Sequence, residues 1–86
     1  MANYRFSEHA LKEMAKRQID RSQVIEVIKN PMQKVPEHLD VICLQSKVQI
    51  QGKPYLLRVM VNENKTPPLI VTVYRTSKID KYWRSV

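Results

Sequence analysis

The apolar positions of this chain change their period about one third of the way along it. Between Glu8 and Gln18 the small and apolar residues recur at helical spacing and fall on one arc, which consists of Ala10, Leu11, Met14 and Ala15. Ser7, directly before this stretch, has the side chain of a helix N-cap. The pattern therefore predicts an amphipathic helix over residues 8–18 that buries one face.

A second helix is predicted to begin about two residues after the first one ends. Asp20 is its expected N-cap, Gln23 occupies the third helical position of a capping box, and Ile19 is placed to pack onto Val24. Asn30-Pro31 ends the helix, because the residue before a proline disfavours the helical conformation. A link this short between two helices predicts a helical hairpin.

Elsewhere the apolar residues alternate with polar ones, as in strands. Extended segments are expected at residues 2–6, 33–35, 40–51, 55–62 and 69–75. Pro36-Glu37-His38 is expected to break the second of them, and Gly52 suits the positive φ of a hairpin turn. In the last strand, the inward positions are expected to be Leu69, Val71 and Val73, whereas Ile70 and Tyr74 face outward.

The order of these elements predicts the fold class. Short connections favour antiparallel neighbours, and only the helical hairpin is available to cover the apolar face of the sheet. Ser77 is the expected cap of a short final helix. We therefore predict a single α+β domain over residues 1–86, with two layers: an N-terminal helical hairpin packed on a three- to four-stranded antiparallel sheet, followed by a short C-terminal helix.

The charge of the chain narrows the class of partner. Fifteen Lys and Arg residues against eight Asp and Glu residues give a net charge of +7. A field of this sign attracts polyanions, so nucleic acid is the first expected partner and an acidic protein the second, although many small basic proteins are merely soluble. No apolar run approaches the ~20 residues that span a bilayer, and Cys43 is the single cysteine. These features predict a cytoplasmic protein without a membrane segment or a disulfide.

The outward face of the sheet is the first candidate site. Its polar members come from three consecutive strands and comprise Gln45, Lys47, Arg58, Thr72 and Tyr74. Lys78 and Tyr82 of the final helix are expected beside them. A cationic sheet with a tyrosine suits single-stranded RNA, whose phosphates bind Arg and Lys and whose bases stack on the aromatic ring. The alternative is a solvated face, but Leu56, Met60 and Ile70 on the same face indicate either a bound molecule or cover by the C-terminal helix.

The second candidate site lies on the first helix, where His9, Glu13 and Arg17 are four residues apart and share one flank. A histidine beside a carboxylate and a guanidinium has the composition of a general base with an anion stabiliser. The same spacing also describes an ordinary surface network of i, i+4 pairs.

The chain offers no ligand set for a metal or cofactor. His9 and His38 are far apart in sequence, and a single cysteine does not complete a zinc site. A glycine-rich phosphate loop and a dinucleotide fingerprint are both absent from the sequence. We therefore predict activity without a metal or cofactor.

Several short motifs spread over nearly the whole chain carry a resemblance. They are Phe6-Ser7-Glu8-His9-Ala10, Arg17-Gln18-Ile19, Asn30-Pro31, Val73-Tyr74-Arg75-Thr76-Ser77-Lys78 and Lys81-Tyr82. Together they resemble the pattern of a bacterial family of domains of unknown function, which is itself similar to the RelE/ParE and BrnT toxins of toxin–antitoxin systems. The usual member has glycine where this chain has Gln18, which indicates that the position does not need a positive φ.

The resemblance implies a function and roles for individual residues. RelE and BrnT toxins cut RNA without metal, so we expect a metal-independent endoribonuclease that acts on RNA, free or ribosome-bound, and is paired with an acidic antitoxin. The implied catalytic residues are Arg58 and Arg17 for charge stabilisation and His9 or Tyr74 for proton transfer. The resemblance also covers Thr76 and Lys78. The expected nucleic-acid contacts are Lys47, Arg75, Lys78 and Tyr82. Two alternatives stay open: a non-catalytic module that binds RNA or an acidic protein, and a protein-directed toxin like the gyrase-directed ParE branch.

Overall fold

The first helix of the protein is fixed to the sheet at its N-terminus. The computed structural model describes residues 3–85, and in it α1 spans Glu8–Arg17. The Ser7 hydroxyl oxygen accepts the Ala10 N–H at 2.9 Å, as expected for an N-cap, and the same hydroxyl donates to the carbonyl of Val71 in the sheet at 2.7 Å. The cap therefore also sets where the helix enters the fold.

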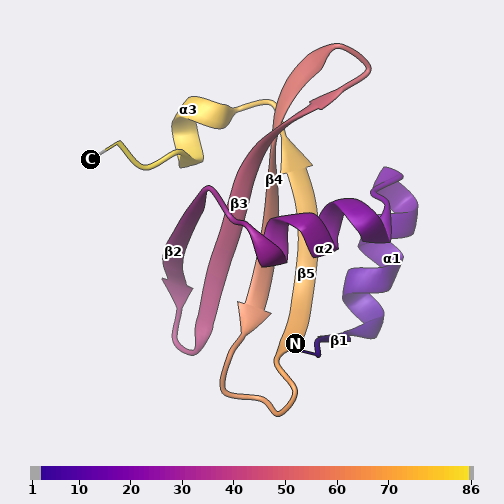
Figure 1. The fold of residues 1–86 in the computed structure, drawn as a ribbon, viewed down its shortest axis with the longest axis vertical. Helices are drawn as coiled ribbons and strands as arrows, with labels where there is room; N and C mark the ends of the chain where they lie inside the picture. Colours follow the sequence, from indigo (N-terminus) through magenta and orange to yellow (C-terminus); the bar gives the residue numbers. More distant parts are fainter. Residues whose placement is uncertain (1–2, 86) are drawn as a thin grey trace.

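The second helix, α2 (Arg21–Lys29), begins after Asp20 as predicted. The Gln23 side-chain oxygen accepts the Asp20 N–H at 3.1 Å, which completes one half of the expected capping box. The two helices lie on the same face of the sheet, with α1 packed mainly on one edge and α2 over the middle (Figure 1). The predicted helical hairpin is confirmed.

The turn between the two helices corrects one expectation. Gln18 has φ of +56°, so the position that glycine occupies in similar sequences does need the left-handed conformation. Its N–H donates to the carbonyls of Met14 and Ala15, and the Ile19 N–H donates to the Met14 carbonyl at 2.9 Å. These bonds satisfy carbonyls at the helix end that would otherwise lack partners.

Within residues 3–85 the sheet has five strands and is mixed, whereas three or four antiparallel strands were expected. The strands are β1 (Arg5–Phe6), β2 (Gln33–His38), β3 (Val41–Ile50), β4 (Lys53–Asn62) and β5 (Leu69–Thr76). Their spatial order is β1-β5-β4-β3-β2 (Figure 1). β2 to β5 are antiparallel neighbours, and β1 is the fifth strand, running parallel to β5.

The parallel strand arises from the extended segment predicted at residues 2–6, of which residue 2 lies outside the described residues. The Arg5 N–H donates to the Pro68 carbonyl at 2.9 Å, and the Ser7 N–H donates to the Ile70 carbonyl at 3.0 Å. Parallel neighbours need a long connection, and here the chain between β1 and β5 contains the helical hairpin and the strands β2, β3 and β4.

The edge strand β2 is longer than expected. Pro36-Glu37-His38 does not end it: the pairing with β3 continues to His38, with an irregularity between Pro36 and His38. β2 is the outermost strand, and a proline is tolerated at an edge because its missing N–H removes no ladder hydrogen bond there. The extension brings Glu37 beside the face that is described below.

A β-bulge in β5 changes which of its side chains point towards the helices. Met60 pairs with Thr72 and Val61 pairs with Ile70, so Val71 is an extra residue on β5. Ile70 is consequently buried on the helix side, and the expectation that it faces outward is wrong. Val71 packs on the opposite face instead, against a small cluster around Met60.

The main core fills the space between the helices and one face of the sheet. Its buried members are Ala10, Met14, Ile19, Val24, Val27, Ile28, Leu44, Leu57, Val59, Val61, Ile70 and Val73. The alternation predicted for β3 and β4 is confirmed, because Leu44, Leu57, Val59 and Val61 face the helices. The fold class α+β is thereby confirmed as well.

The chain ends in α3 (Ile79–Tyr82), for which Lys78, not the expected Ser77, occupies the N-cap position. None of the four helical residues is buried. Within residues 3–85, no helix is long and apolar enough to cross a membrane.

Candidate functional site

Four polar side chains form a continuous row across the sheet face that α1 and α2 leave free. Gln33 on β2 pairs with Gln45 on β3, Gln45 pairs with Arg58 on β4, and Arg58 pairs with Tyr74 on β5. Direct cross-strand partners point to the same side of a sheet. The four side chains therefore meet because the strand register aligns them.

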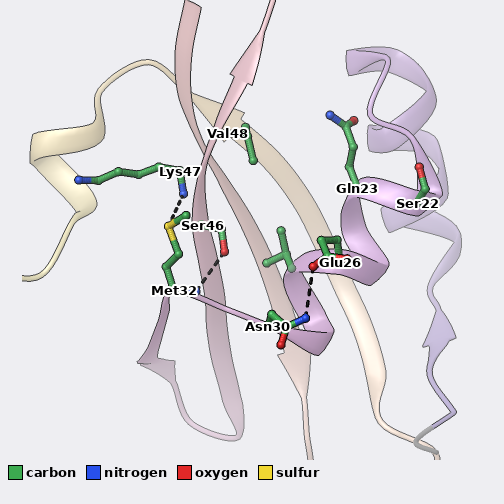
Figure 2. Close-up of a pocket in the computed structure, with 9 residues that line it drawn as sticks. Ser22, Gln23, Glu26, Asn30, Met32, Ser46, Lys47 and Val48 are labelled. Carbon is green, nitrogen blue, oxygen red and sulfur yellow. Dashed lines mark hydrogen bonds between the residues drawn. The ribbon is translucent and has the colours of Figure 1, made fainter.

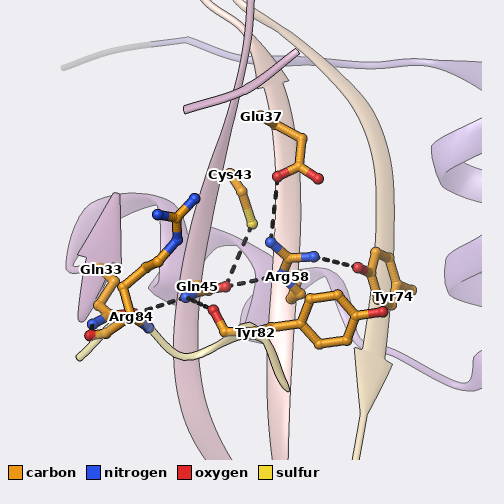
Figure 3. A network of polar contacts seen from close by, with 8 residues as sticks. All are labelled: Gln33, Glu37, Cys43, Gln45, Arg58, Tyr74, Tyr82 and Arg84. Atoms are coloured by element: carbon orange, nitrogen blue, oxygen red, sulfur yellow. Dashed lines mark hydrogen bonds and ion pairs between the residues drawn. The ribbon is translucent and has the colours of Figure 1, made fainter. Parts of the chain in front are cut away.

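Hydrogen bonds run along the whole row (Figure 3). The Gln45 amide nitrogen donates to Gln33 Oε1 at 2.8 Å, and its amide oxygen accepts from Arg58 Nε at 2.9 Å. Arg58 Nη1 donates to the Tyr74 hydroxyl oxygen. Because the tyrosine oxygen accepts here, the Tyr74 hydroxyl proton is available to a further acceptor.

Arg58 is the centre of the row and is almost completely buried, with 3% of its surface exposed. Arg58 Nη2 lies 3.4 Å from Glu37 Oε2, and its guanidinium carbon lies 4.4 Å from the centre of the Tyr82 ring. Burial is the largest single influence and opposes the positive charge, but the hydrogen bond to Tyr74 and the electrostatic effects of Cys43, Tyr74 and Glu37 together outweigh it, and the pKa of Arg58 is raised. The guanidinium therefore stays charged, with a carboxylate and an aromatic face beside it.

The tyrosine of the row remains protonated at neutral pH. Burial raises the pKa of Tyr74 above its ordinary value, although the hydrogen bond from Arg58 opposes this shift. A protonated hydroxyl beside a fixed guanidinium is a proton donor, not a base. Glu37, whose side chain is 37% exposed, places a carboxylate oxygen 3.4 Å from Arg58 Nη2 and is the candidate proton acceptor.

The C-terminal segment, residues 79–84, covers this row. The Gln45 amide nitrogen also donates to the Tyr82 carbonyl at 3.2 Å, and the Gln33 side chain binds both the backbone N–H and the carbonyl of Arg84 (Figure 3). Lys47 Nζ lies 4.1 Å from the centre of the Trp83 ring. Of the two interpretations of this face, cover by the C-terminal helix is confirmed.

A small apolar cluster lies alongside the row, two residues away along β2, β3 and β4. Val35, Cys43 and Met60 are its buried members. Burial raises the pKa of the Cys43 thiol to about 11, so the thiol stays protonated at neutral pH. Cys43 is thus a packing residue, as its lack of basic sequence neighbours suggested.

The structure divides the predicted site residues between the two faces of the sheet. Arg58, Tyr74, Tyr82 and Lys47 gather on the face that carries the row. Arg17 and Arg75 meet on the helix side, where Arg75 Nη1 donates to the Arg17 carbonyl. His9 is exposed on α1, and Lys78 is exposed at the N-cap of α3. His9 and Arg17 are therefore not brought to Arg58.

Pairing within α1 resembles the surface network weighed above. Arg17 Nε lies 3.0 Å from Glu13 Oε1. The hydrogen bond from Arg17 lowers the pKa of the Glu13 carboxyl group. Glu13 therefore serves as the partner of Arg17.

Reasoning from the sequence assigned no role to Gln33 or Glu37. It also did not predict that Gln45 is a centre of hydrogen bonds. Gln45 was placed on the correct face by alternation, but its contacts depend on register. Gln33 and Glu37 are four residues apart, with Val35 midway between them, so the alternation of a strand would place all three on one face. This spacing could have indicated that Gln33 and Glu37 share a strand face. Pro36 between them was instead interpreted as the end of the strand.

A separate hollow of about 380 Å³ lies between α2 and the half of β3 that extends beyond β2 (Figure 2). At this edge the Met32 N–H donates to the Ser46 hydroxyl at 3.1 Å, and the Lys47 N–H points to the Met32 sulfur at 3.3 Å. The Lys47 side chain extends away from the hollow towards α3 (Figure 2). The hollow therefore does not share side chains with the row.

Comparison with known proteins places the chain in a family. The model of a domain of unknown function, DUF4258, matches residues 6–75. The chain belongs to the DUF4258 family. The matched part contains every strand residue of the row, whereas the covering segment follows it. No curated protein matches, and no solved structure matches. The DUF4258 assignment agrees with the expected family of uncharacterised domains and adds no link to RelE, ParE or BrnT.

Proposed function

We propose that this DUF4258 protein is a metal-independent endoribonuclease of the kind found in RelE- and BrnT-like toxins, with Arg58 at its centre. The observation that supports this proposal is the contact of one charged guanidinium with a tyrosine hydroxyl, a carboxylate and an aromatic ring. The net charge of +7 supports RNA as the substrate, because it favours binding of a polyanion.

The proposed reaction uses the 2′-hydroxyl of the RNA as the nucleophile. Glu37 accepts the proton of the 2′-hydroxyl as its oxygen forms a bond to the adjacent phosphorus atom. Arg58 stabilises the negative charge that develops on the phosphoryl oxygens. The bond from phosphorus to the 5′-oxygen then breaks, and Tyr74 donates its hydroxyl proton to that oxygen. The products are a 2′,3′-cyclic phosphate and a 5′-hydroxyl.

This assignment differs from the expected roles in one respect. His9 and Arg17 lie on α1, on the other side of the sheet, so the proposal gives their tasks to Glu37 and Arg58. Tyr74 keeps the proton-transfer role that the sequence predicted for it. Lys47 and Tyr82 remain as candidate contacts to the RNA backbone and bases.

The proposal requires the C-terminal segment, residues 79–84, to move away from Arg58. No residue of α3 is buried, and the segment is held by the hydrogen bonds of Gln33 and Gln45 and by the ring contacts of Tyr82 and Trp83. A segment with little buried apolar surface opens at a small cost in free energy. An acidic antitoxin is a further proposed partner, since it would compete with RNA for the same positive surface.

The test is cleavage of RNA by the purified protein in the presence of a chelator. Tyr74→Phe and Glu37→Gln should each reduce the rate by about 100-fold or more, the usual range for a general acid or base. Tyr4→Phe and Glu63→Gln are the matched controls, because Tyr4 packs on the helix-side core and Glu63 pairs with Lys34. Equal rates for the site variants and their controls would remove this site from the reaction.

A second candidate function follows from the burial of Arg58. With 3% exposure and partners for each of its nitrogens, Arg58 also suits a structural role under a permanent C-terminal cover. The protein would then be a non-catalytic module that binds RNA through its exposed cations. Binding that weakens steeply with salt, without any cleavage, would favour this function.

A further inference from the structure

A second positively charged surface lies at the opposite face of the sheet, where β4 begins and β5 ends beside the C-terminus of α1. It encloses a shallow hollow of about 690 Å³. The lining residues are Lys16, Arg17, Tyr55, Arg75, Thr76 and Ser77. We call it the α1–β5 hollow. Three elements that are far apart in sequence thus contribute cations, an aromatic ring and hydroxyl groups to one place.

The guanidinium of Arg75 is held in a fixed position in this hollow. Its Nη1 donates to the Arg17 carbonyl at the end of α1, and its central carbon lies 5.5 Å from the centre of the Tyr55 ring. One of the two terminal nitrogens is thereby engaged, and Arg75 is only half-buried. A guanidinium has five N–H donors in a planar fork, so the remaining ones can bind an anion.

The hollow has an excess of positive charge. Arg17 is paired with Glu13 at 3.0 Å, but within residues 3–85 no carboxylate forms an ion pair with Lys16 or Arg75. The polar part of its lining also includes the hydroxyls of Thr76 and Ser77. Two unpaired cations with hydroxyls beside them form a surface that favours a phosphate group.

An aromatic ring beside these cations narrows the ligand class. Tyr55 is half-buried, and its ring lies within the lining of the hollow. Proteins that hold single-stranded nucleic acid combine cations for the backbone with aromatic rings on which bases stack. A simple anion such as inorganic phosphate would use the cations alone and gain nothing from the ring.

We propose that the α1–β5 hollow binds a nucleotide of single-stranded RNA, with its phosphate on Lys16 and Arg75 and its base against Tyr55. The inference rests on the proposed function in taking RNA as the ligand, and it adds a binding site away from the reacting bond. Tyr74 and Arg75 are consecutive on β5 and point to opposite faces. A strand that passes over the end of the sheet, beside the exposed Lys78, reaches both sites.

The first experiment measures binding of a 2′-O-methyl oligoribonucleotide to the full chain. This probe lacks the nucleophile of the proposed reaction, so its binding is independent of cleavage. Lys16→Glu should weaken binding about ten-fold or more and reduce the salt dependence. Lys29→Glu is the matched control, because Lys29 is also exposed in the last turn of a helix but lies outside the hollow. The control should change binding less than about three-fold.

The second experiment tests the aromatic ring. Tyr55→Leu should weaken binding of the same probe about five-fold or more, the lower range for loss of one stacked base. It should leave the weak binding of inorganic phosphate unchanged. Amide chemical shifts on addition of adenosine monophosphate should change around Lys16, Tyr55 and Arg75. If only phosphate binds, and Tyr55→Leu has no effect, the hollow is a simple anion site and the RNA proposal is wrong.

The outcomes separate this inference from the proposed function. Equal effects of Lys16→Glu and Lys29→Glu would show that overall charge alone drives binding, and they would overturn the inference. Site-specific loss of binding without any cleavage of unmodified RNA would support the hollow and remove the nuclease. Because Lys16 is exposed, its variant keeps the test valid even if substitutions of Arg75 prevent folding.

Discussion

Gln45 and Arg58 face each other across β3 and β4, and the Gln45 amide oxygen accepts the Arg58 Nε–H at 2.9 Å. Gln45 is fully buried, and its amide nitrogen serves Gln33 and the Tyr82 carbonyl at the same time. A single amide therefore joins the sheet, the arginine and the C-terminal segment. The same hydrogen bond orients the guanidinium so that its Nη1 donates to the Tyr74 hydroxyl oxygen.

The first prediction concerns this amide. Gln45→Ala leaves Nε of the buried Arg58 and the carbonyl of the half-buried Tyr82 without these partners, so the free energy of unfolding should fall by about 2–4 kcal/mol. Urea denaturation followed by circular dichroism measures the change. Gln49→Ala is the control, because Gln49 is exposed on the same strand, and it should stay within about 0.5 kcal/mol of the parent. Similar values for the two variants would mean that the row adds no stability.

The row also shows how far the sequence predicts this fold. Strict alternation in β3 and β4 gave the facing of their side chains correctly, because period 2 depends only on local geometry. In β5, the extra residue Val71 reverses the facing of Ile70. At this bulge the Ser7 hydroxyl, 64 residues away in sequence, donates to the Val71 carbonyl, and such a contact leaves no local pattern.

The burial of Arg58 was the main feature beyond the reach of the sequence. An arginine between apolar strand residues predicts a functional position only if the face is open, and α3 covers that face. Apolar residues on this face indicated either a bound molecule or a cover, and the contacts of Tyr82 with Gln45 and Arg58 that decide between them are not encoded by hydrophobic periodicity. The sequence therefore predicted that Gln45, Arg58 and Tyr74 share one sheet face, but it did not predict their contacts with the C-terminal segment.

The second prediction concerns the turn between α1 and α2. Gln18 has φ of +56°, a conformation that costs a residue with a Cβ atom about 1 kcal/mol. Gln18→Gly should therefore raise the free energy of unfolding by about 0.5–1 kcal/mol. Lys12→Gly, in the middle of the same helix, should instead lower it by about 1 kcal/mol. Thermal unfolding measures both, and a loss of stability in Gln18→Gly would contradict the strained conformation.

The third prediction uses the buried thiol. Burial raises the pKa of Cys43 to about 11 from an ordinary value near 9. Between pH 9 and 11 the unfolded chain has therefore lost a proton that the folded chain keeps, and stability falls as the pH rises through this range. Below pH 9 the contribution is fully present.

Cys43→Ala should remove this part of the pH dependence. The loss of stability between pH 8 and pH 10.5 should become smaller by about 1–2 kcal/mol in the variant, since one pKa unit corresponds to 1.36 kcal/mol. Tyr74, whose pKa is also raised by burial, is present in both proteins and does not affect the comparison. Urea denaturation at the two pH values measures the difference, and identical losses would show that the thiol is accessible to solvent.

The fourth prediction concerns movement of the C-terminal segment, residues 79–84. Trp83 is the only tryptophan of the chain, and its ring lies 4.1 Å from Lys47 Nζ, so its fluorescence reports the position of the segment. If RNA reaches Arg58, the segment must leave the row. Addition of the 2′-O-methyl oligoribonucleotide should then shift the emission to longer wavelength and increase quenching by acrylamide.

Deletion of residues 79–86 tests the same movement without the use of Trp83 fluorescence. If the open state is about 10% populated in the full chain, removing the cover should tighten RNA binding about ten-fold, because the cost of opening disappears. The deletion also removes Lys81, Arg84 and Asp80, a net loss of one positive charge, so a purely electrostatic effect would weaken binding instead. Tighter binding despite the lost charges therefore indicates that the cover competes with RNA. Unchanged Trp83 emission at saturating RNA, together with weaker binding of the deletion variant, would place the cover permanently on Arg58 and favour the non-catalytic module.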